Sequence, residues 1–299
     1  MSDPLRRLAD AVLYEGYILW PYRRSATKNR QRWTFGGVYP PAHTGAHPDD
    51  PCVVQTQVVV ERSCDVEVTA RFLHVVERAL VNTAGERVDE LHGLLAWDEA
   101  TEREVRAGPG RTAIEVSGGH ETEPVDGGAI VRSWRALSGH VDVRVEPTDG
   151  ASRVTVRIEN TTRLEAEARD RPDVLRQTFC STHVVLHTEH GAFVSATETE
   201  CENVGLWPVL AGEEGARSTM LAAPIILPDY PQIAPESPGD LFDATEIDKL
   251  LILNVLALTP EEQAEMRASD PRAREILDRC AALSPEELMR LHGAIREFG

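Results

Sequence analysis

The chain has 299 residues and a formal net charge of −18, from 31 basic and 49 acidic residues. Such an acidic chain disfavours nucleic acid as the main partner, because phosphate backbones are bound by basic surfaces. The sequence has no run of roughly 18 apolar residues and no apolar segment typical of a secretory signal, so we predict a cytoplasmic protein without a transmembrane segment. The five cysteines are widely spaced and form no CxxC pair, which predicts reduced thiols.

Residues 1–41 are predicted to form a helix followed by a basic and aromatic segment. Pro4 suits the first helical position, and apolar residues recur at helical spacing from Leu5 to Leu13. Gly16 is expected to end this helix. The residues after it predict a loop, with a short extended piece at Trp33–Phe35.

This N-terminal segment has an unusual charge. Residues 1–33 carry seven basic and three acidic groups, whereas the rest of the chain carries a net charge of −22. Arginine beside aromatic residues is typical of protein–protein contact surfaces and of anion sites. A further interpretation is that these arginines pair with the acidic body of the same chain. The candidate partner-binding residues are Trp20, Tyr22, Arg23, Arg24, Lys28, Arg30, Arg32 and Trp33.

Residues 42–51 are rich in turn-forming residues and are expected to be exposed. His43 and His47 lie there beside Asp49 and Asp50, and we interpret them as part of a solvated loop rather than as metal ligands.

Residues 52–221 change to a period-two pattern with β-branched runs, which predicts a β-rich body. The stretch HVDVRVEPTDGASRVTVRIENTT predicts an antiparallel hairpin with its turn near Asp149 and Gly150. Residues 80–102 are ambiguous and are expected to form a connecting excursion. The expected fold class is α+β: an antiparallel β-sandwich or barrel-like body with an N-terminal helix and a C-terminal tail of short helices.

Residues 222–242 contain five prolines, which predict an extended connector that lies along the body. Residues 243–299 follow as a helical tail with repeated capping signals, such as Asp243 with Glu246 and Thr259-Pro260 with Glu262. The expected helices are at 244–257, 260–268, 271–282 and 285–297.

Three histidines, His183, His187 and His190, are weak candidates for a metal site. On a strand, His183 and His187 share a face, but their Cα atoms lie roughly 13 Å apart at about 3.3 Å per residue. One metal ion would therefore need a bend in the chain, and half-buried or surface histidines are the favoured interpretation. No phosphate-binding glycine loop and no G-x-S-x-G motif occur, so no cofactor is expected and a binding protein is favoured over an enzyme.

Three stretches resemble a known family: LYEGYILWPYRRSATKNRQRWTFGG, ERSCDVEVTARFLHVVER and YPQIAPESPGDLFDATEIDKLLILNVLALTPEE. They are similar to a bacterial protein family encoded beside actinobacterial-type nickel–iron uptake hydrogenases. The resemblance implies an accessory role in assembly, maturation or docking of such a hydrogenase, with hydrogenase subunits or maturation factors as partners. It transfers no catalytic residues.

Two other functions stay open from the sequence. One is a metal-dependent enzyme or small-ligand binder that uses a β-sandwich cleft and the histidine cluster. The other is a structural subunit of a larger complex, in which the proline-rich connector would wrap a neighbour.

Overall fold

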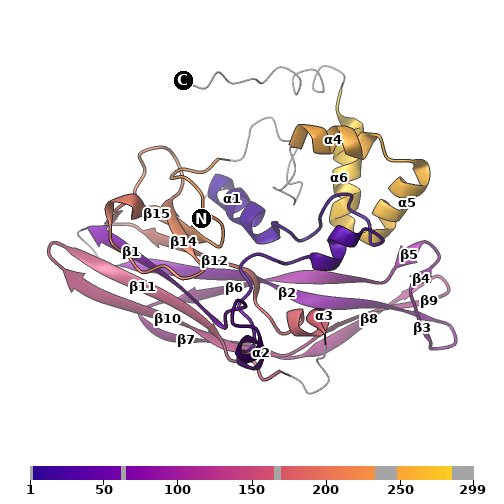
Figure 1. Ribbon diagram of the computed structural model, residues 1–299, viewed down its shortest axis with the longest axis horizontal. Coiled ribbons are helices and arrows are strands. Elements are labelled where there is room, and N and C mark those ends of the chain that lie inside the picture. The colour runs from indigo at the N-terminus through magenta and orange to yellow at the C-terminus, as the bar shows by residue number, and fades with distance from the viewer. Residues whose placement is uncertain (1–2, 62–64, 165–169, 233–247, 285–299) are drawn as a thin grey trace.

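The computed structural model describes residues 3–61, 65–164, 170–232 and 248–284 (Figure 1). The described residues form mostly antiparallel β-sheets, with an N-terminal helix and short C-terminal helices, so the expected α+β class is confirmed. None of the described helices is long and apolar enough to cross a membrane.

Two antiparallel sheets make up the body. The smaller sheet has the strand order β13 (Ala192–Phe193), β1 (Val53–Glu61), β11 (Ala151–Asn160), β10 (Leu137–Thr148) and β7 (Gly110–Val116). The larger sheet has the order β14 (Trp207–Leu210), β15 (Thr219–Ala223), β12 (Cys180–Thr188), β2 (Val66–Asn82), β9 (Gly128–Trp134) and β8 (Gly119–Val125). Strands β6 (Trp97–Ala107) and β3 (Arg87–Val88) also pair with β2, and β4 (Glu90–Leu91) pairs with β5 (Leu94–Leu95) in a small hairpin.

The two sheets share one apolar core, which explains the period-two sequence pattern. Along β1, every second residue is buried, as expected for a strand with one face toward a core. The core takes Val58 from β1, Val156 from β11, and Phe72 from β2. Phe72 stacks on Phe179 with ring centroids 4.5 Å apart. The body is therefore a β-sandwich, one of the two architectures expected.

A layer of helices lies on one side of the sheets (Figure 1). It consists of α1 (Asp3–Tyr14), α4 (Asp248–Leu256), α5 (Pro260–Ser269) and α6 (Pro271–Ala282). Leu5, Ala9 and Val12 of α1 pack against β12, β14 and β15. Leu73 and Val75 of β2 belong to a cluster with α4, α5 and α6, so β2 is buried on both faces.

Shorter helices complete the described fold. They are α2 (Pro41–Ala46), α3 (Arg171–Leu175) and the 3-10 turns η1 (Thr27–Gln31) and η2 (Ala196–Glu198). The presence of α2 corrects the expectation of turns alone at 42–51, because Pro40 and Pro41 lead into one and a half helical turns. The extended piece expected at Trp33–Phe35 is wrong, because Trp33 has a φ of 54° in the left-handed region and the chain bends there.

The hairpin expected around Asp149 and Gly150 is confirmed as β10 and β11, with Thr148 paired to Ala151 across the turn. Gly150 has a φ of 74°, which glycine adopts without steric cost. The ambiguous stretch 80–102 contains the end of β2, the short strands β3 to β5, and the start of β6. This excursion becomes important below because it forms a wall of a cleft.

The tail helices follow their capping signals. The helices expected at 260–268 and 271–282 are confirmed as α5 and α6. Thr259 and Glu262 form a reciprocal capping box, and Asp270 caps α6 by accepting a hydrogen bond from the Arg272 backbone N–H at 2.8 Å. The helix expected at 244–257 is described from Asp248 to Leu256, whereas the cap at Asp243 and the helix at 285–297 lie outside the described residues.

The proline-rich connector is described up to residue 232, and its first two residues belong to β15. Ile225 and Leu227 pack against the cluster around α1. The Tyr230 N–H donates to the Leu210 carbonyl at 2.7 Å. The expectation that the connector lies along the body is confirmed for residues 224–232.

Candidate functional site

The basic and aromatic segment lies between the larger sheet and the tail helices. Tyr22 and Trp33 are buried, and Trp20 and Lys28 are half-buried; the side chain of Arg30 lies outside the described part of the chain. Asn29 connects the two ends of the segment: its side-chain amide donates to the Leu19 carbonyl and its Oδ1 accepts from the Leu19 N–H, each at 2.8 Å. The segment is a structural layer as well as a source of charge.

Arg32 is buried between two indole rings. Its guanidinium carbon lies 3.7 Å from the ring centroid of Trp97 and 4.0 Å from that of Trp33, which are cation–π distances. Its N–H groups donate to the carbonyls of Tyr17 and Asp98. Burial lowers the pKa of Arg32 to about 10, so the side chain is still a cation at neutral pH.

Asp270 joins three distant parts of the chain beneath this segment. Its Oδ2 accepts hydrogen bonds from the Tyr17 hydroxyl at 2.8 Å and from the Trp97 Nε1–H at 3.1 Å, and its Oδ1 accepts the cap bond from Arg272. The carboxylate is 1% exposed, so these donors replace the water that it would otherwise bind.

The two neighbouring arginines pair with acidic residues of the same chain. Arg23 lies 3.0 Å from Glu262 of α5. Arg24 donates to the Oδ1 of Asp89 at 2.8 Å and to its carbonyl at 3.0 Å. Pairing with the chain's own acidic residues, one of the three interpretations of this segment, is therefore observed for both arginines.

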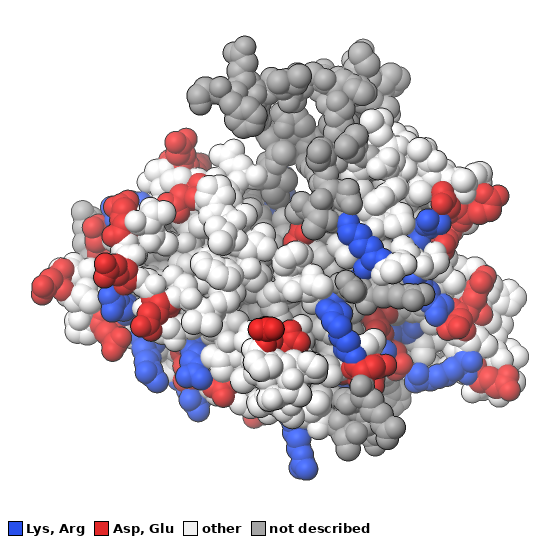
Figure 2. Space-filling view, viewed as in Figure 1, with Lys and Arg blue, Asp and Glu red and all other residues white. Residues whose placement is uncertain are grey.

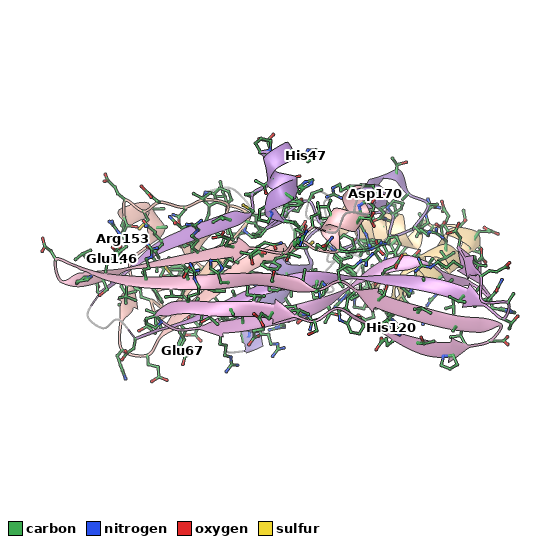
Figure 3. All side chains as sticks on the ribbon, turned by 90° about the horizontal axis from the view of Figure 1, so that it is seen from below. His47, Glu67, His120, Glu146, Arg153 and Asp170 are labelled. Carbon is green, nitrogen blue, oxygen red and sulfur yellow. The ribbon has the colours of Figure 1, made fainter. Side chains whose placement is uncertain are left out.

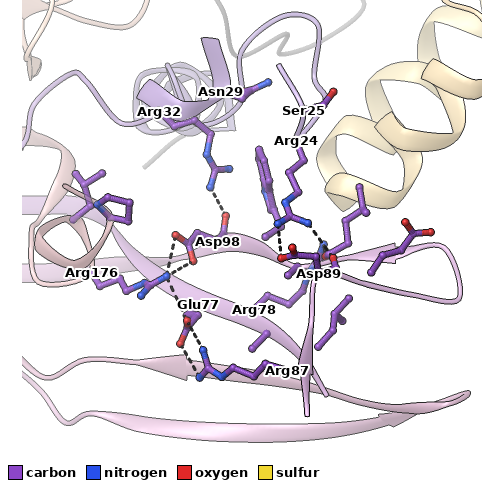
Figure 4. Close-up of a pocket in the computed structure, with 18 of the residues that line it drawn as sticks. Arg24, Ser25, Asn29, Arg32, Glu77, Arg78, Arg87, Asp89, Asp98 and Arg176 are labelled. Atoms are coloured by element: carbon purple, nitrogen blue, oxygen red, sulfur yellow. Dashed lines mark hydrogen bonds and ion pairs between the residues drawn. The ribbon is translucent and has the colours of Figure 1, made fainter. Parts of the chain in front are cut away.

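A cleft of about 1210 Å³ opens beside this layer (Figure 4). Its walls come from the basic segment, the end of β2, the β3–β5 excursion, α3 and α5. In Figure 4 the labelled arginines reach toward its centre from different elements. Six arginines and five acidic residues line it: Arg24, Arg32, Arg78, Arg87, Arg171, Arg176, Glu77, Asp89, Glu90, Asp98 and Glu265. The described lining thus carries a slight positive excess within a chain of net charge −18.

The arginines of the cleft fall into two groups by their exposure. Arg78 and Arg176 are largely buried and hold the walls together: Arg78 pairs with Glu99 at 2.9 Å and donates to the Ser269 carbonyl, and Arg176 pairs with Asp98 at 3.0 Å. Arg24 and Arg87 lie at the rim, with side chains 34% and 67% exposed. Of these four arginines, only Arg24 and Arg87 are open to a partner without breaking a buried contact.

Two cations of the lining are held mainly by carbonyl oxygens. Arg32 donates to the carbonyls of Tyr17 and Asp98, and the carboxylates of Asp98 and Asp270 lie near enough to interact with its charge. Arg171 donates to the carbonyls of Arg32 and Trp33 and also bonds Tyr39. Three buried N–H groups on lining residues have no acceptor among the described residues: Trp33 Nε1, Arg78 Nε and Arg176 Nε. Positive charge and unmet donors together favour an anionic, hydrogen-bond-accepting occupant.

The candidate metal histidines do not converge. His183 is fully buried and its Nδ1 faces the Ser181 carbonyl at 3.2 Å, His187 pairs with the Thr219 hydroxyl at 2.9 Å, and the His190 side chain is 72% exposed. A bulge between Cys180 and His183 separates the start of β12 from its regular part. Within the described ranges, no group of three or more potential ligands could hold a metal ion.

The other histidine pair lies on α2. His43 stacks between Tyr39 and His47 and pairs with Asp50 at 2.7 Å, which gives it a structural role in this turn. His47 is exposed and projects from the body (Figure 3).

Sequence reasoning found one wall of the cleft and missed the others. Arg24, Arg32 and Trp33 were among the candidate residues, whereas Arg78, Arg87, Arg171 and Arg176 were not. Arg78 carries a signal that could have revealed it, because it interrupts an otherwise apolar strand run, HVVERAL, that is expected to be buried. Arg87, Arg171 and Arg176 come together at the cleft only through tertiary contacts, which no local sequence pattern indicates.

Acidic and basic side chains lie beside one another at both ends of the face in Figure 2, rather than in large patches of one sign. The cleft is therefore set apart by its shape and its arginine content, not by a surrounding basic surface. A comparison with models of known protein families finds no match, and a comparison with curated proteins finds none either.

Proposed function

We propose that this protein is a cytoplasmic accessory protein that binds another protein at the arginine-lined cleft, in the assembly, maturation or docking of a nickel–iron hydrogenase. The observation that carries the binding role is the cleft itself, in which six arginines from four segments of a strongly acidic chain meet. Arginine is favoured at protein interfaces because its planar guanidinium makes paired hydrogen bonds with carboxylates.

The chemistry of the lining supports binding rather than catalysis. The lining residues that the structure describes include no histidine and no cysteine. Their one hydroxyl group, on Ser25, donates to the rim carboxylate of Glu265 at 3.0 Å, and Glu265 is shared with Arg23 and the Ser25 N–H.

The hydrogenase context rests on the resemblance of the three stretches. Two of these stretches build the cleft: residues 13–37 supply Arg24, Arg32 and Trp33, and residues 61–78 supply Glu77 and Arg78. These lining residues link the resemblance to the cleft, which supports a shared binding role.

The cytoplasmic location is part of the same proposal. Cys180 and Cys280 are buried free thiols, and burial raises their pKa values to about 12 and about 11. Protonated, buried thiols suit a reducing compartment.

Affinity purification tests the proposal, with the tagged protein expressed in cells that make the hydrogenase. We expect a hydrogenase subunit or maturation factor to co-purify, and the double variant Arg24→Glu/Arg87→Glu to retain at least 10-fold less of it. Absence of any hydrogenase component in the wild-type sample would reject the hydrogenase context.

Arg111→Glu is the matched control for Arg87. Arg111 is 65% exposed and bonds both oxygens of Asp142 on a neighbouring strand, as Arg87 bonds both oxygens of Glu77. It lies on β7, in the other sheet and outside the lining of the cleft. Equal loss in Arg111→Glu and in the double variant would reject the cleft as the docking site.

A further inference from the structure

We propose that the occupant of the cleft is an extended acidic peptide segment of the partner, and that Asp89 holds Arg24 in its place until the segment binds. This inference rests on the proposed function and names the kind of chain that the cleft recognises.

The Arg24–Asp89 contact is suited to exchange. The Asp89 side chain is 87% exposed and Arg24 is 34% exposed, with 2.8 Å between Arg24 NH2 and Asp89 Oδ1. Exposed ion pairs contribute little to stability, because water solvates both charges nearly as well. A carboxylate of a partner can therefore replace that of Asp89 at little cost.

The backbone around Asp89 stays in place during this exchange. The Asp89 carbonyl accepts from the Ala96 N–H at 2.9 Å as well as from Arg24 NH1. The β4–β5 hairpin beyond it turns at His92 and Gly93, both with positive φ, as a two-residue hairpin turn requires. Rotation of the Asp89 side chain frees the Nη2 of Arg24 for a partner carboxylate, while the Nη1 keeps its bond to the Asp89 carbonyl.

The inner wall offers a second position for negative charge. Arg171 is half-buried, and its NH2 donates to the carbonyls of Arg32 and Trp33, at 3.0 and 3.4 Å. Arg32 behind it is a buried cation whose charge the carboxylates of Asp98 and Asp270 offset only in part, so it adds positive potential to the inner wall. A ligand with carboxylates at more than one position can use the rim and the inner wall together.

The size and the lining select a peptide over other anions. A volume of about 1210 Å³ is far larger than a single phosphate or carboxylate group needs. Val88, Leu95 and Pro172 also line the cleft and are not buried, so they can receive apolar side chains. The five acidic lining residues disfavour nucleic acid, because it carries a phosphate at every nucleotide and some phosphates would lie against carboxylates. A peptide can place neutral residues opposite those carboxylates.

Fluorescence anisotropy with labelled synthetic peptides tests the inference on the full-length protein. The acidic probe is a ten-residue peptide in which an acidic residue (Glu or Asp) alternates with an apolar one (Leu or Val). In the neutral probe Gln or Asn replaces each acidic residue, and in the basic probe Lys replaces it. We expect the acidic peptide to bind at least 10-fold more tightly than the neutral one, and the Lys peptide not to bind. Equal binding of the acidic and neutral peptides would overturn the inference.

Two variants separate exchange from general electrostatics. Arg24→Gln should weaken the acidic peptide at least 5-fold, whereas Asp89→Asn should strengthen its binding 2- to 5-fold because the internal competitor is gone. Asp126→Asn is the control, because Asp126 is 94% exposed and pairs with His92 rather than with an arginine of the cleft. If Asp89→Asn has no larger effect than Asp126→Asn, the exchange is wrong.

Competition identifies the other possible outcomes. Polyphosphate or single-stranded DNA that displaces the acidic peptide at equal charge concentration would show a general polyanion site and overturn the inference. If the peptides fail while the purification still retains a hydrogenase component through Arg24 and Arg87, the inference fails and the proposed function stands. If the peptides bind but no hydrogenase component is retained, the hydrogenase context fails and the acidic-peptide inference stands.

Discussion

The sandwich core and the junction between the larger sheet and the helices are held together by different physics. The core between the sheets consists of apolar side chains such as Phe72, Val156 and Leu186, which a period-two pattern delivers. The junction buries aromatic rings together with Arg32 and Asp270, which lie far apart in the sequence. The core gains stability from area removed from water, whereas the junction depends on each buried polar group keeping its partner.

This difference has a functional consequence. A cleft that presents arginines needs walls that hold them, and Arg78 and Arg176 are placed by contacts to Ser269 and Asp98 at the junction. The sandwich core, as far as the structure describes it, consists mainly of apolar side chains and serves as the rigid support. Stability and recognition are therefore divided between the two regions.

Phe72→Ala should give the largest loss of stability in the molecule, about 4 kcal/mol in the free energy of unfolding. Phe72 is fully buried and stacks on Phe179, so its removal leaves a cavity in the sandwich core. Urea unfolding followed by far-UV circular dichroism and by tryptophan fluorescence measures it. If the two signals separate in the variant, the core and the junction unfold independently, and the core is not the support of the junction.

Asp270→Ala should cost somewhat less, about 3 kcal/mol, because it leaves buried donors without an acceptor. The donors are the Tyr17 hydroxyl, the Trp97 Nε1–H and the Arg272 backbone N–H. Thermal unfolding measures the loss, and a change in tryptophan fluorescence should accompany it. Asp278→Ala is the control, since Asp278 is 56% exposed and should change stability by less than about 0.5 kcal/mol.

Acid should destabilise the protein partly through His183. Burial, with Arg71 nearby, lowers its pKa from 6.5 to about 3, and its Nε2 has no partner in the described part of the chain. Between these two pKa values the folded state keeps the neutral ring while the unfolded chain takes up a proton. The free energy of unfolding is therefore unaffected by His183 above about pH 6.5 and decreases as the pH falls from there toward 3. At pH 5 this loss amounts to about 2 kcal/mol, from about 1.4 kcal/mol per pH unit.

The variant His183→Gln isolates this contribution. His74 is also buried, and burial with Arg103 nearby lowers its pKa to about 4, so it keeps its own pH dependence in the variant. Urea unfolding at pH 7 and pH 5 should show a loss that is about 2 kcal/mol smaller in His183→Gln than in the wild type. The same loss in both proteins would mean that His183 is protonated in the folded state.

Local rules predict the parts of this fold that local sequence controls. The β10–β11 hairpin, α5 and α6 follow from alternation, an Asp-Gly turn and capping residues within a few positions of each element. The expectation at Trp33–Phe35 is wrong because tertiary contacts hold Trp33 at positive φ, including the bond from its N–H to the Gly16 carbonyl at 3.1 Å. No pattern within the segment indicates that geometry.

The candidate site shows the same limit. The arginines at 23, 24 and 32 stand out in the sequence, but whether they face a partner or their own chain depends on Glu262, Asp89 and Trp97, which are 65 to 239 positions away. Their pairing with the body and their place on a cleft wall are compatible, because Arg24 does both. Sequence alone presents these as alternatives.

The smallest effect on stability is expected at the rim of the cleft. Arg87→Ala and Arg111→Ala each remove one exposed ion pair, so each should lower the free energy of unfolding by less than about 1 kcal/mol. Urea unfolding of the two variants side by side measures this. Salt should reduce even this difference, since both pairs are open to solvent. A loss of about 3 kcal/mol for Arg87→Ala alone would place Arg87 with the buried contacts of the junction, and the rim would then not be free to exchange partners.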